Sequence, residues 1–148
     1  MLTHHALGLL WDFDDPAGSE QRLRDAARRP GSSPELRAEI GTQVARALGR
    51  LRAPGARAAC ERLLDKPSWG EVLRARGIEG LGSLRDVAVL PTLLRLTEAA
   101  APPRARAAAA AALARLAAER EAARTPALER LVELAEDPNF RVQVSAIN

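Results

Sequence analysis

The feature that most constrains this chain is an internal repeat of about 35 residues. A five-residue motif with leucine at its second and fifth positions occurs three times, at intervals of 33 and 32 residues. Its copies are Ala47-Leu48-Gly49-Arg50-Leu51, Gly80-Leu81-Gly82-Ser83-Leu84 and Ala112-Leu113-Ala114-Arg115-Leu116. A period of roughly 20–50 residues is typical of chains built from small units that stack to bury a shared core. The fold class must therefore allow such stacking.

Prolines recur at a similar spacing and mark where helices are expected to begin. A proline in the first turn of a helix costs nothing, because its missing N–H has no partner there. The prolines are Pro34, Pro67, Pro103 and Pro138. Ser33 and Asp137 precede two of them and are predicted N-caps, and Ser68 with Glu71 fits a capping box.

The apolar residues follow a helical period, and no stretch alternates at period two. The first long stripe is Leu36, Ile40, Val44, Leu48 and Leu51. A shorter second helix follows each first one; in the third repeat we expect it to start at Thr125-Pro126. The unit is thus a pair of antiparallel helices, and the class is all-α.

Helical hairpins of this kind stack into an α-solenoid, because no unit can bury its apolar face alone. We expect a single domain with repeats at 34–66, 67–102 and 103–137, after a degenerate hairpin at 1–33 made of Leu2–Trp11 and a helix over Ser19–Arg29. Residues 107–112, all alanine, and three glycines should let neighbouring helices approach closely. The glycines are Gly77, Gly80 and Gly82.

Residues 138–148 read as the first helix of a further repeat without its second helix. We expect either that the chain is a piece of a longer protein or that a partner covers this end.

The repeat pattern over residues 34–148, with Ala-Leu-Gly-x-Leu closing a helix and an early proline such as Pro91 in the next, resembles HEAT repeats. A narrower resemblance is to the C-terminal HEAT-like domain of bacterial aminopeptidase-N-like (gluzincin) zinc metallopeptidases. It is carried by Pro67-Ser68-Trp69-Gly70-Glu71-Val72-Leu73-Arg74-Ala75, Gly80-Leu81, Val89-Leu90-Pro91-Thr92-Leu93-Leu94 and Pro102-Pro103-Arg104-Ala105-Arg106-Ala107-Ala108.

That resemblance implies a non-catalytic domain that packs on a catalytic domain and limits access to it. The family's zinc motif, H-E-x-x-H, is absent from this sequence, so zinc would belong to the parent protein and no cofactor to this chain. His4 and His5 are adjacent, so on a helix they point about 100° apart and do not form a metal-binding pair.

Composition excludes several function classes. Lysine and arginine exceed acidic residues by only three, without a strongly cationic segment, so nucleic-acid binding is not favoured. No uncharged apolar run is long enough to span a membrane.

Cys60, the single cysteine, is predicted to be a buried structural thiol. The lack of disulfides and of a signal sequence predicts the cytoplasm, with a signal peptide upstream of this segment as the alternative.

Two other features have a structural interpretation. Asp12, Asp14 and Asp15 are predicted to form a loop in which Asp15 caps a helix, and Trp69 is predicted to pack between hairpins.

The alternative function is a HEAT-repeat scaffold that binds a protein or peptide partner on a concave face lined by the second helices. The candidate binding residues there are Arg57, Glu61, Arg62, Arg95, Glu129, Arg130 and Glu133. We expect no catalytic activity from the chain under either function.

Overall fold

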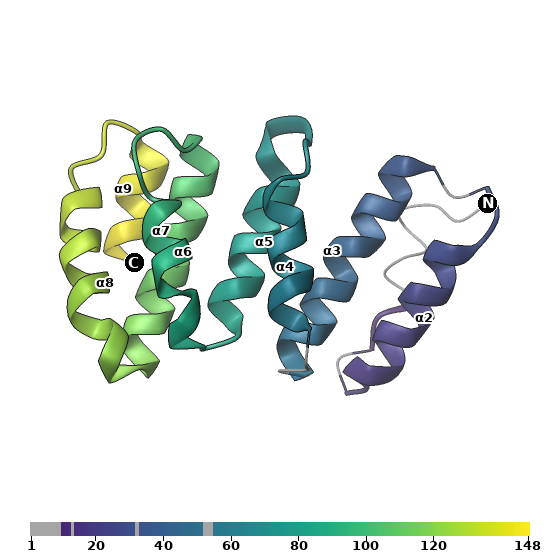
Figure 1. The fold of residues 1–148 in the computed structure, drawn as a ribbon. Helices are drawn as coiled ribbons and strands as arrows, with labels where there is room; N and C mark the ends of the chain where they lie inside the picture. Colours follow the sequence, from purple (N-terminus) through teal and green to yellow (C-terminus); the bar gives the residue numbers. More distant parts are fainter. Residues whose placement is uncertain (1–9, 13, 32, 52–54) are drawn as a thin grey trace.

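The protein is a row of helices (Figure 1). The computed structural model describes residues 10–12, 14–31, 33–51 and 55–148. Within them, the α-helices are α2 (Pro16–Arg28), α3 (Pro34–Leu51), α4 (Ala56–Leu64), α5 (Val72–Ser83), α6 (Leu90–Arg95), α7 (Pro103–Glu119), α8 (Glu121–Leu134) and α9 (Phe140–Ile147). Two short 3-10 helices are η2 (Trp69–Glu71) and η3 (Val87–Val89). These ranges contain no β-strand, and the all-α class is confirmed.

The helices stack as hairpins in two layers. Helices α3, α5, α7 and α9 pack side by side in a first layer, because each contacts the next in that order. Helices α4, α6 and α8 form a second layer, as predicted for a helical-repeat solenoid. Helices α4 and α8 each pack against the first-layer helices before and after them, whereas α6 packs on α7 and on α8. Helix α2 packs on α3 at the N-terminal end (Figure 1).

One hydrophobic core runs through most of this stack, from Ala45 on α3 to Val142 on α9. The close approach expected between first-layer helices is confirmed where α5 meets α7: a Cβ placed on Gly82 would lie 2.7 Å from the Cβ of Ala112. Gly77 and Gly80 instead face α4, where an added Cβ would lie 2.7 Å from the carbonyl oxygen of Cys60 and 2.6 Å from its Sγ, respectively.

Two of the four prolines begin a helix as predicted. Pro34 and Pro103 are the first residues of α3 and α7, and Ser33 caps α3 by accepting a hydrogen bond from the N–H of Leu36 at 3.1 Å. Pro138 does not begin α9: the helix starts two residues later, and Asn139 caps it. The predicted cap, Asp137, is engaged in an ion pair instead.

The start predicted at Pro67 and the capping box after it are wrong. Gly70 (φ 56°) and Glu71 (φ 61°) both adopt the left-handed conformation, which ends η2 and delays the start of α5. The Oγ of Ser68 consequently accepts from the N–H of Leu73 at 3.0 Å, and the side chain of Glu71 pairs with Arg74.

The start predicted for the second helix of the third repeat is also wrong, because α8 begins at Glu121 and contains Pro126. The first turn closes without that proline, through a 3.0 Å hydrogen bond from the N–H of Ala123 to the carbonyl of Arg120. Pro126 lies further along the helix, where its missing N–H removes one intrahelical hydrogen bond.

At the N-terminal end, Asp15 caps α2 as predicted and accepts a 2.8 Å hydrogen bond from the N–H of Gly18. The helix begins at Pro16, before the predicted Ser19. His4, His5 and most of the hairpin predicted for Leu2–Trp11 lie outside the described residues. No helix in the described ranges combines the length and apolar character that a membrane span requires.

Candidate functional site

The predicted binding residues lie on three helices of the second layer. On α4, Arg57 and Glu61 form an ion pair, with Nε and Oε1 2.8 Å apart. The hydrogen bond and charge of Glu61 raise the pKa of Arg57. Arg62 on the same helix and Arg95 on α6 are exposed. An ion pair and exposed arginines of this kind are expected on any solvated helix surface. A binding role for these four residues stays a prediction.

Arg130 on α8 has a structural role. Its Nε donates to the hydroxyl of Thr97 at 2.7 Å, and its Nη2 donates to the Thr97 carbonyl at 3.1 Å. Arg130 also pairs with Glu133, while Glu129 is exposed. Since Thr97 is buried, Arg130 holds α8 against the end of α6.

One candidate, Arg95, lines a cavity of about 330 Å³ at the loops that follow α4 and α6. Asp65, Arg74 and Glu98 line it too, and none of the other six predicted binding residues does. The structure therefore does not gather the predicted set in this cavity.

Cys60 is fully buried, as predicted. Burial raises the pKa of its thiol to about 11, so the thiolate needed for nucleophilic or metal chemistry is scarce at neutral pH. Asp12 and Asp15 engage in local hydrogen bonds, and the described residues contain no group of side chains arranged to hold a metal ion.

The prediction for Trp69 is wrong, because its side chain is 89% exposed and does not pack between hairpins. The physical reason is the left-handed Gly70 and Glu71, which place Trp69 in a separate 3-10 turn before α5.

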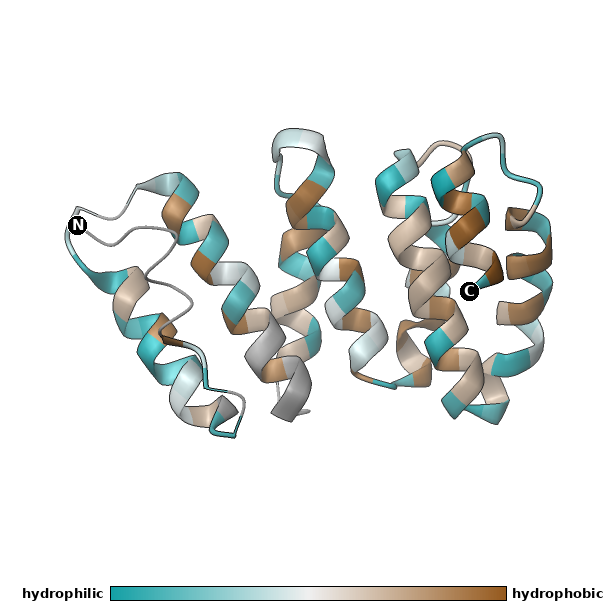
Figure 2. Ribbon diagram, turned by 180° about the vertical axis from the view of Figure 1, so that it is seen from behind, coloured by the Kyte–Doolittle hydropathy of each residue, from teal (hydrophilic) through white to brown (hydrophobic). Residues whose placement is uncertain are grey.

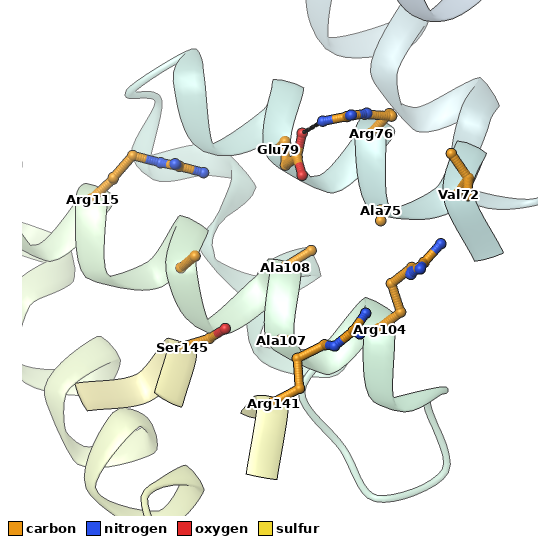
Figure 3. Close-up of a pocket in the computed structure, with 11 residues that line it drawn as sticks. Val72, Ala75, Arg76, Glu79, Arg104, Ala107, Ala108, Arg115, Arg141 and Ser145 are labelled. Carbon is orange, nitrogen blue, oxygen red and sulfur yellow. Dashed lines mark hydrogen bonds and ion pairs between the residues drawn. The ribbon is translucent and has the colours of Figure 1, made fainter. Parts of the chain in front are cut away.

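A groove that the sequence analysis missed crosses the first layer between α5, α7 and α9 (Figure 3). Its volume is about 430 Å³. We call it the arginine groove; its lining residues are Val72, Ala75, Arg76, Glu79, Arg104, Ala107, Ala108, Ala111, Arg115, Arg141 and Ser145. The signal that could have found it is helical spacing, since Arg104, Ala108, Ala111 and Arg115 share one face of α7.

A second feature is an apolar surface at the end of the row, which we call the α8–α9 end. It consists of exposed Leu128 and Val132 on α8 and Phe140, Val144 and Ile147 on α9. The two α8 residues are four apart and the three α9 residues four and three apart, so each set forms one helical stripe. Figure 2 shows hydrophobic segments on both helices beside the C-terminus.

Comparison with known protein families supports the architecture. The model of the family described as HEAT repeats matches residues 20–114, which is more than half of the chain. The chain therefore belongs to the HEAT-repeat family, which the resemblance over residues 34–148 predicted. No curated protein matches this sequence.

Proposed function

We propose that this chain is a non-catalytic HEAT-repeat domain that docks on another protein through its α8–α9 end. The observation that carries the proposal is the concentration of exposed apolar side chains there. Of the six large hydrophobic residues exposed in the described part of the chain, five belong to this surface and the sixth is Trp69.

The arrangement of those five side chains fits docking. On α9, Val142 on the opposite flank is fully buried against the core, while Phe140 and Ile147 are 77% and 72% exposed. On α8, Leu131 and Leu134 are buried, while Val132 is 72% exposed. Each helix thus uses one apolar flank for the core and leaves a second one uncovered. Helices α8 and α9 contact each other, so the exposed apolar side chains lie on neighbouring helices. Exposed apolar groups of this kind are typical of protein contacts, and burying one such side chain contributes about 1.5–3 kcal/mol.

The finer form of the proposal is that the partner is the catalytic domain of a zinc aminopeptidase-like protein. Its support is the sequence resemblance between Pro67 and Ala108, which spans α5, α6 and the start of α7. In that form the zinc and the catalytic residues belong to the partner.

Site-specific photo-crosslinking in the source cells tests both forms. A benzophenone amino acid placed at Val132 or Ile147 should give the same crosslinked protein, whereas one at exposed Ala58 on α4 should not. Mass spectrometry then identifies the partner. A partner whose sequence contains H-E-x-x-H supports the peptidase form of the proposal. A single partner without that motif rejects the peptidase form but not docking through the α8–α9 end. Absence of a crosslink from both positions, or the same products from all three, rejects docking through this end.

A further inference from the structure

We propose that the arginine groove binds an acidic peptide segment of a protein. This site lies on the first layer, on side chains other than those of the α8–α9 end, so the two proposals can fail independently.

Four arginines line the groove, and within the described part of the chain only one of them has an acidic partner. Nη1 of Arg76 lies 2.7 Å from Oε2 of Glu79. Among the described residues, no carboxylate pairs with Arg104, Arg115 or Arg141, and none of these three guanidinium groups makes a hydrogen bond. Arginines elsewhere are commonly paired within the chain, as in the contacts of Arg24 with Glu20 and Arg85 with Glu119. The groove therefore collects cationic groups that the fold itself does not use.

The positions of these side chains suit an elongated ligand. Arg104 and Arg115 lie near opposite ends of α7, and Arg141 projects from the start of α9. Figure 3 shows Arg104 and Arg141 gathered at one end of the groove and Arg115 at the other. Carboxylates spaced along a peptide could meet both ends, because a guanidinium group offers a fork of donors that matches a carboxylate.

The floor between the arginines is made of small side chains. Ala107 is buried and Ala108 and Ala111 are half-buried, so a peptide backbone can approach α7 closely. This floor and the volume of about 430 Å³ fit a few peptide residues with small or apolar side chains between acidic ones.

The same features favour a peptide over nucleic acid. The alanine floor of the groove offers no aromatic surface on which bases could stack. A duplex requires an extended surface of one charge, and the net charge of the whole chain is only +3.

Selection from a phage library of random twelve-residue peptides tests this proposal on the full chain. We expect the selected peptides to be enriched in aspartate and glutamate. The best peptide, labelled with fluorescein, is then measured by anisotropy against Arg104→Glu/Arg141→Glu and against the matched control Arg28→Glu/Arg124→Glu. Both double variants change the net charge equally, and the control arginines lie outside the groove.

We expect the groove variant to weaken binding at least tenfold, the control to weaken it less than twofold, and Val132→Asp to leave it unchanged. Circular dichroism of each variant confirms folding. Three results would overturn the proposal: selection without acidic enrichment, equal losses in both charge-reversed variants, or tighter binding of a twelve-nucleotide DNA through the same arginines.

Discussion

At the scale of single residues, the most informative contact is the buried ion pair between Arg106 and Asp137. Nε and Nη2 of Arg106 lie 3.1 and 2.9 Å from the two carboxylate oxygens, and Nη1 donates to the carbonyl of Ala101 at 2.7 Å. Both side chains are less than a tenth exposed. The pair ties the start of α7 to the loop before α9, so it positions the α8–α9 end.

We predict that Asp137→Asn lowers the free energy of unfolding by about 3 kcal/mol at pH 7, because it leaves a buried guanidinium without its counter-charge. The hydrogen bond from Arg106 lowers the pKa of Asp137 below its ordinary 3.8. A lowered folded-state pKa contributes stability above the unfolded-state pKa and loses it as the pH falls through the folded-state value. The difference between wild type and variant should therefore shrink below about pH 4.

Urea unfolding at pH 7 and pH 3 measures that difference. Asp25→Asn is the control, because its ion pair with Arg28 is exposed and should contribute less than about 1 kcal/mol. Equal effects of the two substitutions, or a deficit in Asp137→Asn that persists unchanged at pH 3, would contradict the assigned role of the pair.

At the scale of helices, close packing of α5 on α7 depends on Gly82. An added Cβ would lie 2.7 Å from the Cβ and 3.0 Å from the Cα of Ala112, so Gly82→Ala must push the helices apart. We predict a loss of about 1–3 kcal/mol in unfolding free energy, typical of overpacking. Gly41→Ala on α3 meets nothing within 4 Å and should gain up to about 1 kcal/mol from helix propensity. Thermal unfolding of both variants measures the two effects; stabilisation by Gly82→Ala would contradict the packing.

The sequence was sufficient to predict the helices and their stacking. The helical period of the apolar residues indicates which face of each helix is buried, and the repeat indicates that the units stack. It was less reliable at helix starts. The left-handed backbone at Glu71 has no marker in residue type, and it moved the start of α5 and exposed Trp69. The role of Asp137 depends on Arg106, a partner 31 residues away, so local capping rules assigned it wrongly.

At the scale of the whole molecule, the candidate sites depend on which helices become neighbours. The arginine groove draws its lining from α5, α7 and α9, so the spacing of Arg104 and Arg115 indicates only the part of the lining that lies on α7. The α8–α9 end was partly predictable, because residues 138–148 read as the first helix of a further repeat and implied either a longer protein or a partner that covers this end. The exposure of Leu128 and Val132 on α8 emerged only from the fold, because their spacing reads as a core stripe.

The central claim is that this HEAT-repeat chain docks through its α8–α9 end. Hydrogen–deuterium exchange, compared between the free chain and its complex with the partner found by crosslinking, tests it most directly. We predict that amides in 128–134 and 140–147 exchange at least tenfold more slowly in the complex, while those of α2 and α4 do not change. Protection confined to α2 or α4, with α8 and α9 exchanging as in the free chain, would contradict the claim.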